Sequence, residues 1–299
     1  MLPIIYAFAF SLLLPAVFIF LLWRANFQTK LDWLLDSILA IFLISWLFQS
    51  SNWSWLGYYI RYLWPVLLII ALYISWKKTR HLSFSLKETE RSKPIVVFYI
   101  VLILVFGYYN IGVFSSYTTN DKPIELQFPL QDGTYYVGQG GNHALMNYHQ
   151  IASSQKYALD ILKINSLGIR AKGIYPKTLE NYYIFGESLH SPCDGKIIEA
   201  RNDVDNVVPP ETDEENIEGN YVKILCDHHD AFVLMAHMQK GSLTVAEDDQ
   251  VAVSQPIGIV GNSGNTTEPH LHIHAELNGE GVPITFDGRF LVRNSIVKQ

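Results

Sequence analysis

Long apolar runs dominate the first 119 residues of the chain, whereas short alternating runs dominate the remainder. A helix needs roughly 20 apolar residues to cross the hydrocarbon core of a bilayer. Four of the long runs approach that length and contain only one acid, Asp36, and one base, Arg61. We therefore predict four transmembrane helices with short loops over residues 1–115. The runs are Pro3 to Trp23, Trp33 to Phe48, Trp55 to Trp76 and Ile95 to Phe114.

The first apolar run also has the length of a secretory signal peptide, which would be removed from the mature protein. It has neither a basic start nor a small-residue cleavage site. We therefore expect the run to be retained as a membrane span.

The basic residues of the loops predict the orientation of these helices, because short cytoplasmic loops carry an excess of Lys and Arg. The loop from Lys77 to Pro94 contains six basic residues and two acids, which places it in the cytoplasm. The loop QSSNWS after the second run carries no charge and is expected outside. Four alternating spans then put both termini, and everything after about Ser115, on the outer side of the membrane.

The residues after 130 form short segments rich in β-branched and aromatic side chains, separated by Gly, Asn and Asp. This pattern is typical of strands and turns, and it predicts an all-β domain over residues 131–299. The polar stretch 116–130 is expected to be the linker between this domain and the membrane region. Asn202 to Gly219 carries seven acids, two prolines and no base, and is expected to be a solvated loop between strands.

Charge divides the chain at the same place as hydrophobicity. Residues 1–119 contain nine Lys or Arg and four acids, whereas the remainder contains thirteen and twenty-four. The acidic outer part argues against nucleic acid as a partner, because nucleic-acid binding requires a basic surface. Cys193 and Cys226 both lie in this outer part, where a pair can oxidise. We expect a disulfide, and two buried free thiols are the alternative.

Three histidines occupy alternate positions in the stretch EPHLHIHAE, namely His270, His272 and His274. On a strand, alternate side chains point to the same face and are about 6 to 7 Å apart. Such a row of imidazoles suits metal binding, proton transfer or both. Asp160 lies in the apolar run YALDILK, where a buried carboxylate is costly unless it binds a cation. His237 ends a further apolar run, AFVLMAH.

Together these stretches resemble the lysostaphin-type zinc metallopeptidases, enzymes that cut peptide bonds in bacterial cell-wall peptidoglycan. The resemblance covers roughly Gly133 to Phe290, and its motifs follow the order of the family. It implies a compact antiparallel β-structure with a groove across one sheet. The motifs are ALDI at Ala158, SPCDGKI at Ser191, MAHM around Ala236, GSLTVAEDDQVAVSQPIGIVGNSG from Gly241 and PHLHIHAE from Pro269.

The resemblance assigns roles to individual residues. It implies that Asp160 and His272 bind one zinc ion per chain, and that His237 and His270 are catalytic. A catalytic zinc ion usually has three protein ligands and a bound water, whose pKa it lowers while it polarises the substrate carbonyl. A neighbouring histidine can then take the water proton or stabilise the developing oxyanion.

The third ligand departs from the family pattern His-x-x-x-Asp, because Lys156 lies four positions before Asp160. A protonated lysine has no lone pair for a metal. We expect His149 to replace it, since NYHQIASSQKYALD can fold as a hairpin that turns between Ser154 and Gln155. Directly opposed residues then have Cβ atoms about 4.5 to 5.5 Å apart. His143 and His274 are weaker candidates, and His190, His228 and His229 are expected to be structural or surface residues.

We therefore expect a membrane-anchored zinc metalloendopeptidase that cleaves peptidoglycan peptides on the extracytoplasmic side of a bacterial cell membrane. Four spans exceed what an anchor needs, which suggests a membrane protein partner in addition to the lipid bilayer. The alternative is a non-catalytic, family-like domain that binds wall peptide or regulates a partner hydrolase, and Lys156 is its main support. A carrier domain of the sugar-phosphotransferase or lipoyl type is a further alternative, because SPCDGKI loosely resembles the turn of those cytoplasmic domains.

Overall fold

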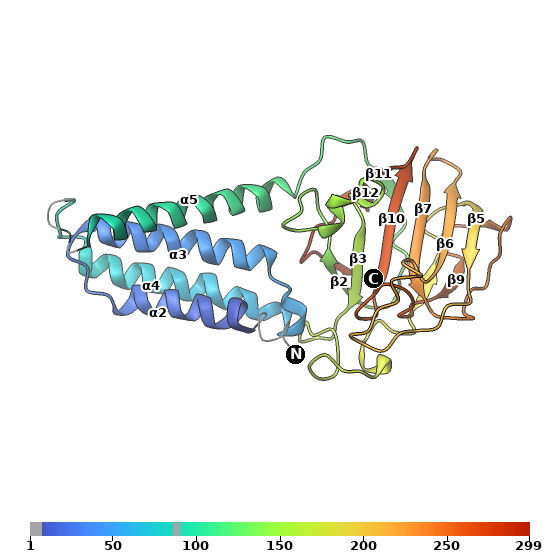
Figure 1. The fold of residues 1–299 in the computed structure, drawn as a ribbon, viewed down its shortest axis with the longest axis horizontal. Helices are drawn as coiled ribbons and strands as arrows, with labels where there is room; N and C mark the ends of the chain where they lie inside the picture. The colour runs from blue at the N-terminus through green and yellow to red at the C-terminus, as the bar shows by residue number, and fades with distance from the viewer. Residues whose placement is uncertain (1–7, 86–88, 90) are drawn as a thin grey trace. The chain divides into compact units, whose positions relative to one another are not determined.

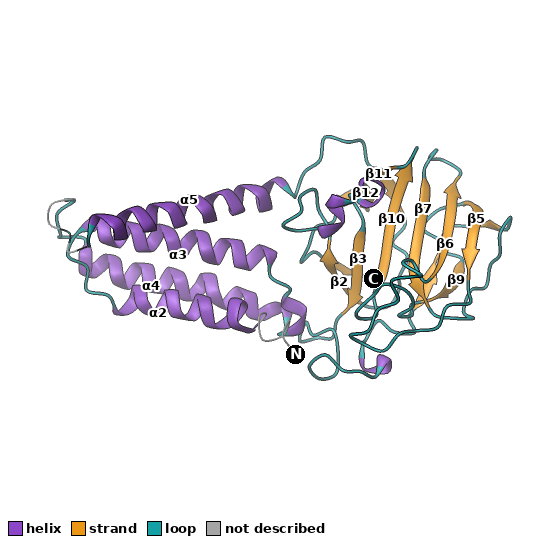
Figure 2. Cartoon of the chain, viewed as in Figure 1, coloured by secondary structure: helices purple, strands orange, loops and turns teal. Residues whose placement is uncertain are grey.

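The computed structural model of the protein describes residues 8–85, 89 and 91–299. The chain divides into two compact units, Met1–Phe114 and Ser115–Gln299. The first unit is helical and the second is rich in strands, as Figure 2 shows. A β-rich domain after an N-terminal helical region is the arrangement that the sequence predicts.

Apolar helices make up the first unit, and their order along the chain can be followed in Figure 1. Three segments are long and apolar enough to cross a membrane, namely Lys30–Ser50, Tyr58–Thr79 and Lys93–Ser115. The helices are α2 (Leu14–Arg24), α3 (Lys30–Ser50), α4 (Leu63–Thr79) and α5 (Lys93–Ser115). Shorter helical pieces are η1 (Ala9–Leu13), η2 (Trp53–Trp55) and η3 (Tyr58–Tyr62).

The first predicted span, Pro3 to Trp23, corresponds to a shorter apolar helix in the described part of the chain, Ala9–Arg24. Its first residues lie outside the described residues. The start of α3 illustrates how these helices are defined by sequence. The Thr29 side chain accepts a hydrogen bond from the backbone N–H of Asp32. The carboxylate of Asp32, in the first turn, interacts favourably with the positive end of the helix dipole.

The two charges within the predicted spans are both accommodated by side chains of the first unit. Arg91 Nη2 lies 2.9 Å from each carboxylate oxygen of Asp36. Arg61 is buried, and its guanidinium carbon lies 3.9 Å from the centroid of the Phe48 ring. A charge-assisted hydrogen bond to a carboxylate and a cation–π contact are both favourable ways to accommodate such charges.

One large sheet forms the framework of the second unit, in the order β14-β2-β3-β10-β7-β6-β5-β8, with β11 paired to β10. All pairings within it are antiparallel, and Figure 1 shows β3, β10, β7 and β6 side by side. Its strands are β2 (Thr134–Gln139), β3 (Leu159–Lys163), β5 (Gly195–Arg201), β6 (Asn220–Cys226), β7 (Phe232–Met238), β8 (Gln250–Val251), β10 (Leu271–Leu277), β11 (Glu280–Val282) and β14 (Ile296–Lys298). The smaller sheets contain β1 (Ile124–Leu126), β12 (Ile284–Phe286) and β13 (Arg289–Phe290), and β4 (Ser188–His190) with β9 (Pro256–Ile259).

The two faces of the large sheet differ in chemistry. Leu271, Ile273 and Ala275 of β10 are buried in the hydrophobic core of the domain. Because side chains alternate along a strand, His272 and His274 point to the opposite face. Asp160 of β3 lies directly across from His272 in the register of the two strands and shares that face. One face therefore supplies the core, and the other carries the polar residues.

The stretch 116–130, which the sequence predicts to be a linker, includes residues that pack on the domain. β1 pairs with β12, and this pairing is parallel. Leu126, Phe128 and Leu130 are buried in the core of the second unit. These three residues recur at every second position, but β1 ends at Leu126 and the intervening Gln127 and Pro129 suggest a loop.

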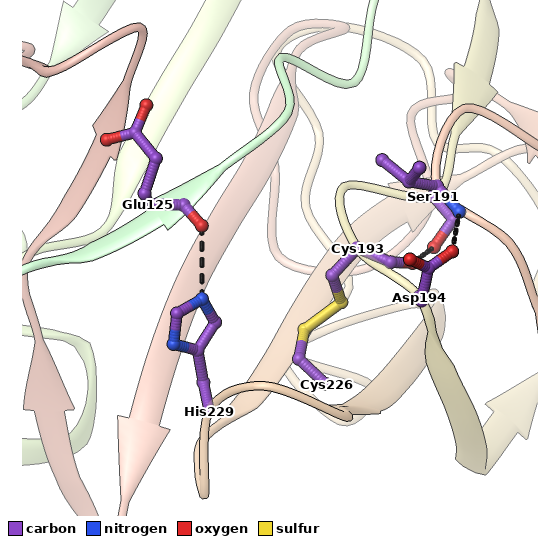
Figure 3. Close-up of a disulfide and its surroundings, with 7 residues drawn as sticks. Glu125, Ser191, Cys193, Asp194, Cys226 and His229 are labelled. Carbon is purple, nitrogen blue, oxygen red and sulfur yellow. Dashed lines mark hydrogen bonds between the residues drawn. A yellow bond between two sulfur atoms is a disulfide. The ribbon is translucent and has the colours of Figure 1, made fainter.

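Cys193 and Cys226 form a disulfide with a Cα–Cα distance of 5.8 Å, which confirms the expected pairing (Figure 3). The bond joins residues next to the start of β5 and at the end of β6, where Gly195 pairs with Cys226. Nearby, the Ser191 hydroxyl donates to the Cys193 carbonyl at 2.6 Å. The disulfide thus fastens the end of the β5–β6 ladder.

Candidate metal centre

Antiparallel pairing brings Asp160 and His272 together from distant parts of the sequence. His272 pairs with Asp160 of β3 on one side and with Ala236 of β7 on the other. The His272 Nδ1 atom lies 3.1 Å from the Asp160 Oδ1 atom. Both residues are buried.

His149 completes a group of three possible ligands. Its Nε2 atom lies 3.0 Å from Asp160 Oδ1, and its side chain is buried. One donor atom each from His149, Asp160 and His272 lie within 4.8 Å of one another. Two imidazole nitrogens and one carboxylate oxygen form a donor set that zinc prefers, and ligand atoms bonded to one ion must converge in this way. The residues present therefore fit a zinc ion.

His149 does not reach Asp160 through the predicted hairpin, and this prediction was wrong. Residues Tyr148–Ile151 and Ser153–Gln155 form the 3-10 turns η4 and η5. Asp160 already pairs with Gln139 of β2 and with His272 of β10. Both edges of β3 are occupied, so no edge remains for a further strand.

The side chain of Asn147 holds the turn that carries His149. Asn147 is fully buried, and its Oδ1 atom accepts a hydrogen bond from the His149 backbone N–H at 3.2 Å. Its Nδ2 atom donates to the carbonyl oxygens of Gly141 at 3.2 Å and Ala158 at 3.0 Å. A single amide thus connects both ends of the segment to the turn that carries His149, a role that is not evident from the sequence.

Lys156 takes no part in the group of ligands. Its Nζ atom forms an ion pair with Asp121 Oδ2 at 3.1 Å, and the side chain is partly exposed. Asp121 also accepts a hydrogen bond from the Tyr157 hydroxyl at 2.7 Å. The lysine at the position of the family's usual ligand therefore fastens residue 121 of the second unit to the segment before β3.

His237 and His270 lie beside the same group. One donor atom each from His237, His270 and His272 lie within 4.8 Å of one another. His237 Nδ1 is 2.9 Å from the Ser263 carbonyl oxygen, and His270 Nδ1 is 2.8 Å from that of Glu268. Because a carbonyl oxygen only accepts, both Nδ1 atoms carry a proton, which leaves each Nε2 with a lone pair while the ring is neutral.

The backbone of His237 adopts an uncommon conformation, with a φ of 62°. Residues other than glycine rarely adopt this left-handed backbone conformation. The strain that it stores tends to occur at functional sites. Two backbone hydrogen bonds hold it, from the His237 N–H to the Glu218 carbonyl and from the Gly261 N–H to the His237 carbonyl. The geometry fixes the direction of the imidazole at the end of β7.

Burial and charge set the protonation states of the group. Burial alone would raise the pKa of Asp160, but the imidazoles of His149 and His270 hold it well below its ordinary value. Burial lowers the pKa of His272 and, more strongly, that of His237. Burial also acts to lower the pKa of His270, yet the neighbouring Asp160 carboxylate raises it overall. The cluster thus combines an ionised carboxylate, Asp160, with a ligand imidazole, His272, that favours the neutral form.

Two further residues lie near the cluster and cannot be recognised as site residues from the sequence. The Tyr148 ring centroid lies 4.1 Å from that of His149, and its hydroxyl is 3.5 Å from Asp160 Oδ2. Arg170 is buried and forms an ion pair with Glu268, whose carbonyl holds His270. Tyr148 and Arg170 were missed because nothing in their neighbourhood along the chain distinguishes them from core or surface residues.

The other histidines lie outside both groups of three. His143 Nδ1 accepts a hydrogen bond from the Leu145 backbone N–H at 3.2 Å. His274 contacts His272 rather than Asp160, with 3.0 Å between His274 Nδ1 and His272 Nε2. The remaining ones in the second unit are His190, His228 and His229, which belong to neither group.

Comparison with known proteins identifies one family. Residues 183–284 match Peptidase family M23. The matched residues include His237, His270 and His272, and they begin after His149 and Asp160. No curated protein sequence matches the chain.

Several solved structures are similar to part of the chain. A proposed peptidase M23 from Pseudomonas aeruginosa is 19% identical over 55% of this chain and 50% of its own, with a TM-score of 0.32. A zinc-containing peptidase from Vibrio cholerae is 17% identical over 54% of this chain and 39% of its own, with a TM-score of 0.31. The catalytic domain of lysostaphin from Staphylococcus simulans is 21% identical over 42% of this chain and 84% of its own, with a TM-score of 0.23. The chain spans half or less of the length of the first two proteins.

Proposed function

We propose that the protein is a membrane-anchored zinc metalloendopeptidase that cleaves peptide bonds in bacterial peptidoglycan, because residues 183–284 match Peptidase family M23. The observation that carries this proposal is the position of Asp160 Oδ1, 3.0 Å from His149 Nε2 and 3.1 Å from His272 Nδ1. These three residues would hold the zinc ion. When bound there, zinc supplies an acidified water and a Lewis acid for the peptide carbonyl.

The remaining chemistry comes from His237 and His270. Each imidazole is oriented by a hydrogen bond from Nδ1 to a backbone carbonyl, so that Nε2 is the nitrogen left for chemistry; the Nε2 atom of His270 lies 3.5 Å from Asp160 Oδ1. One of the two takes a proton from the attacking water, and the other stabilises the charge that develops on the carbonyl oxygen. Both rings are buried, and a buried imidazole interacts more strongly with a developing charge than one in water.

The membrane region indicates on which side of the membrane this reaction would occur. The three long apolar helices suggest an anchor, and we propose that the first apolar helix adds a fourth span. With an even number of spans and a basic, cytoplasmic loop between α4 and α5, the second unit would lie outside the cytoplasm. The disulfide between Cys193 and Cys226 supports the same side, because disulfides persist in oxidising compartments. Peptidoglycan lies on that side, and a membrane protein partner remains part of the proposal.

The rival proposal of a non-catalytic domain drew its support from Lys156. The position of His149 supports the catalytic proposal instead, since a histidine is available near Asp160 although Lys156 replaces the usual ligand. The two proposals differ in a direct measurement on the zinc-loaded full chain in detergent, with crosslinked muropeptides as substrate and mass spectrometry of the products. We expect cleavage by the wild type and none by His237→Ala that retains its zinc. Zinc binding without cleavage by the wild type would favour the non-catalytic domain.

A further inference from the structure

His272 and His274 contact each other on the polar face of β10. Their side chains point to the same face because the residues are two positions apart on one strand. His274 Nδ1 lies 3.0 Å from His272 Nε2, and the ring centroids are 5.2 Å apart. Only 5% of His272 and 4% of His274 are exposed, so water does not compete for this contact.

The other nitrogen of His272 faces the proposed ligands, since its Nδ1 atom is 3.1 Å from Asp160 Oδ1. A neutral imidazole has one N–H and one lone pair. If Nδ1 gives its lone pair to a metal ion, the proton of His272 must be on Nε2. The atom that faces Nε2 is His274 Nδ1, which must then accept this hydrogen bond.

His274 is suited to accept. Its ring is buried against the His272 imidazole, and a neutral imidazole has a lone pair on one of its two nitrogens. His274 is also unsuited to be a ligand itself, because its Nδ1 faces the far side of the His272 ring from Asp160. The ring belongs to neither group of converging donor atoms among the described residues.

We propose that His274 is a positioning residue of the metal centre, which accepts a hydrogen bond from His272 Nε2 and thereby fixes the ring orientation and tautomer of His272. The inference rests on the proposed function, since it requires His272 to be a ligand. Metal-bound histidines generally donate their second N–H to a carboxylate, a backbone carbonyl or water. Here a neutral imidazole takes that role, so the positive charge of a bound zinc ion is balanced by Asp160 alone among the three ligands.

Two variants of the full chain in detergent separate this role from simple packing. In His274→Asn, the side-chain oxygen occupies nearly the place of Nδ1 and can accept the hydrogen bond. In His274→Leu, the volume is kept and the acceptor is lost. Loss of such outer-shell partners typically weakens metal affinity by roughly 10–100-fold. We expect that loss for His274→Leu in a chelator competition with zinc, and a change of less than about threefold, well below that range, for His274→Asn.

A zinc affinity of His274→Leu equal to that of the wild type would overturn the proposal. Should this variant fail to fold, NMR of zinc-loaded wild type with 15N-labelled histidine still decides. The expected result is a proton on Nε2 of both His272 and His274, and a proton on His274 Nδ1 would overturn the proposal.

His272→Ala distinguishes a failure of this inference from a failure of the proposed function. Full zinc binding by His272→Ala would show that the ligand set itself is wrong. Zinc binding that requires His272 but is indifferent to His274→Leu would remove only the positioning role.

Discussion

The Nε2 atom of His149 lies 3.0 Å from the Oδ1 atom of Asp160, although His149 belongs to a 3-10 turn and Asp160 to a central strand. The sheet therefore supplies two of the proposed ligands, and a segment outside the sheet supplies the third. Such an arrangement makes the third ligand dependent on the packing of its own segment. It also means that the strength of metal binding can be changed without altering the sheet.

Removal of the His149 imidazole should weaken zinc binding. Loss of an outer-shell partner alone typically costs 10–100-fold in affinity, so we expect His149→Ala to lose more than roughly 100-fold. The measurement is zinc affinity by chelator competition. His143→Ala is the matched control, because His143 lies on the same segment and its imidazole Nδ1 accepts a hydrogen bond from the Leu145 backbone. Equal affinities for both variants would exclude His149 as a ligand.

The Asn147 side chain should be needed for the position of His149. Asn147→Ala removes the Nδ2 donor of the Ala158 carbonyl, at a cost of about 1–3 kcal/mol for an unpaired buried group, and one of the two donors of the Gly141 carbonyl. We expect faster hydrogen exchange over residues 141–158 and weaker zinc binding. Gln150→Ala is the control, because Gln150 also donates to the Gly141 carbonyl but does not bond to His149. Unchanged zinc affinity in Asn147→Ala would contradict the role.

The metal-free protein should lose stability in mild acid, in part through His274. Burial lowers the pKa of His274 from 6.5 to about 2. Below pH 6.5 the unfolded chain therefore binds a proton that the folded chain does not, so the free energy of unfolding falls as pH falls. One such group contributes a slope of about 1.4 kcal/mol per pH unit.

The comparison of wild type with His274→Leu isolates this contribution, because the lowered pKa values of His237 and His272 act in the same sense and the raised pKa of His270 in the opposite one. We expect a shallower slope for the variant between pH 6.5 and pH 5. All seven tryptophans precede residue 77, so hydrogen exchange of peptides from β10 is the suitable measurement. Identical slopes would contradict the prediction.

Removal of the disulfide should destabilise the second unit without affecting zinc. Cys193 and Cys226 are 33 residues apart in sequence, and a crosslink over a loop of that length contributes about 3–4 kcal/mol in the chain-entropy description. Cys226 lies at the opposite end of β6 from Asn220, which pairs near His237. We expect the double Ser variant to unfold at lower denaturant but to keep its zinc stoichiometry. Lost zinc in a folded variant would show coupling between the two sites.

The central part of the site could be predicted from sequence because it depends on strand alternation. His272 and Asp160 lie in segments whose apolar residues reveal their strands, and the alternate positions on the same strands are free for polar groups. The sequence also predicts that His149 lies near Asp160. It gives the wrong backbone for that segment, because a local pattern does not reveal that β2 and β10 already occupy both edges of β3.

Other features depend on contacts between distant residues and were not predictable. Leu126, Phe128 and Leu130 lie in a polar stretch that reads as a linker, yet they are buried in the core of the domain. Asn147 is a polar residue in a turn-rich segment, and only its partners Gly141 and Ala158 reveal its function. In both cases the role depends on which residues, distant in the sequence, lie beside these residues in the fold.

The zinc content of Asp160→Ala is the decisive measurement of the proposed ligand set, because Asp160 Oδ1 is the atom that both proposed imidazole ligands approach. Metal analysis of the purified full chain in detergent should give one zinc ion per wild-type chain and almost none for Asp160→Ala. Asp121→Ala should retain its zinc, since that acid of the same domain bonds to Lys156 and Tyr157 instead. A folded Asp160→Ala variant with as much zinc as the wild type would contradict the claim.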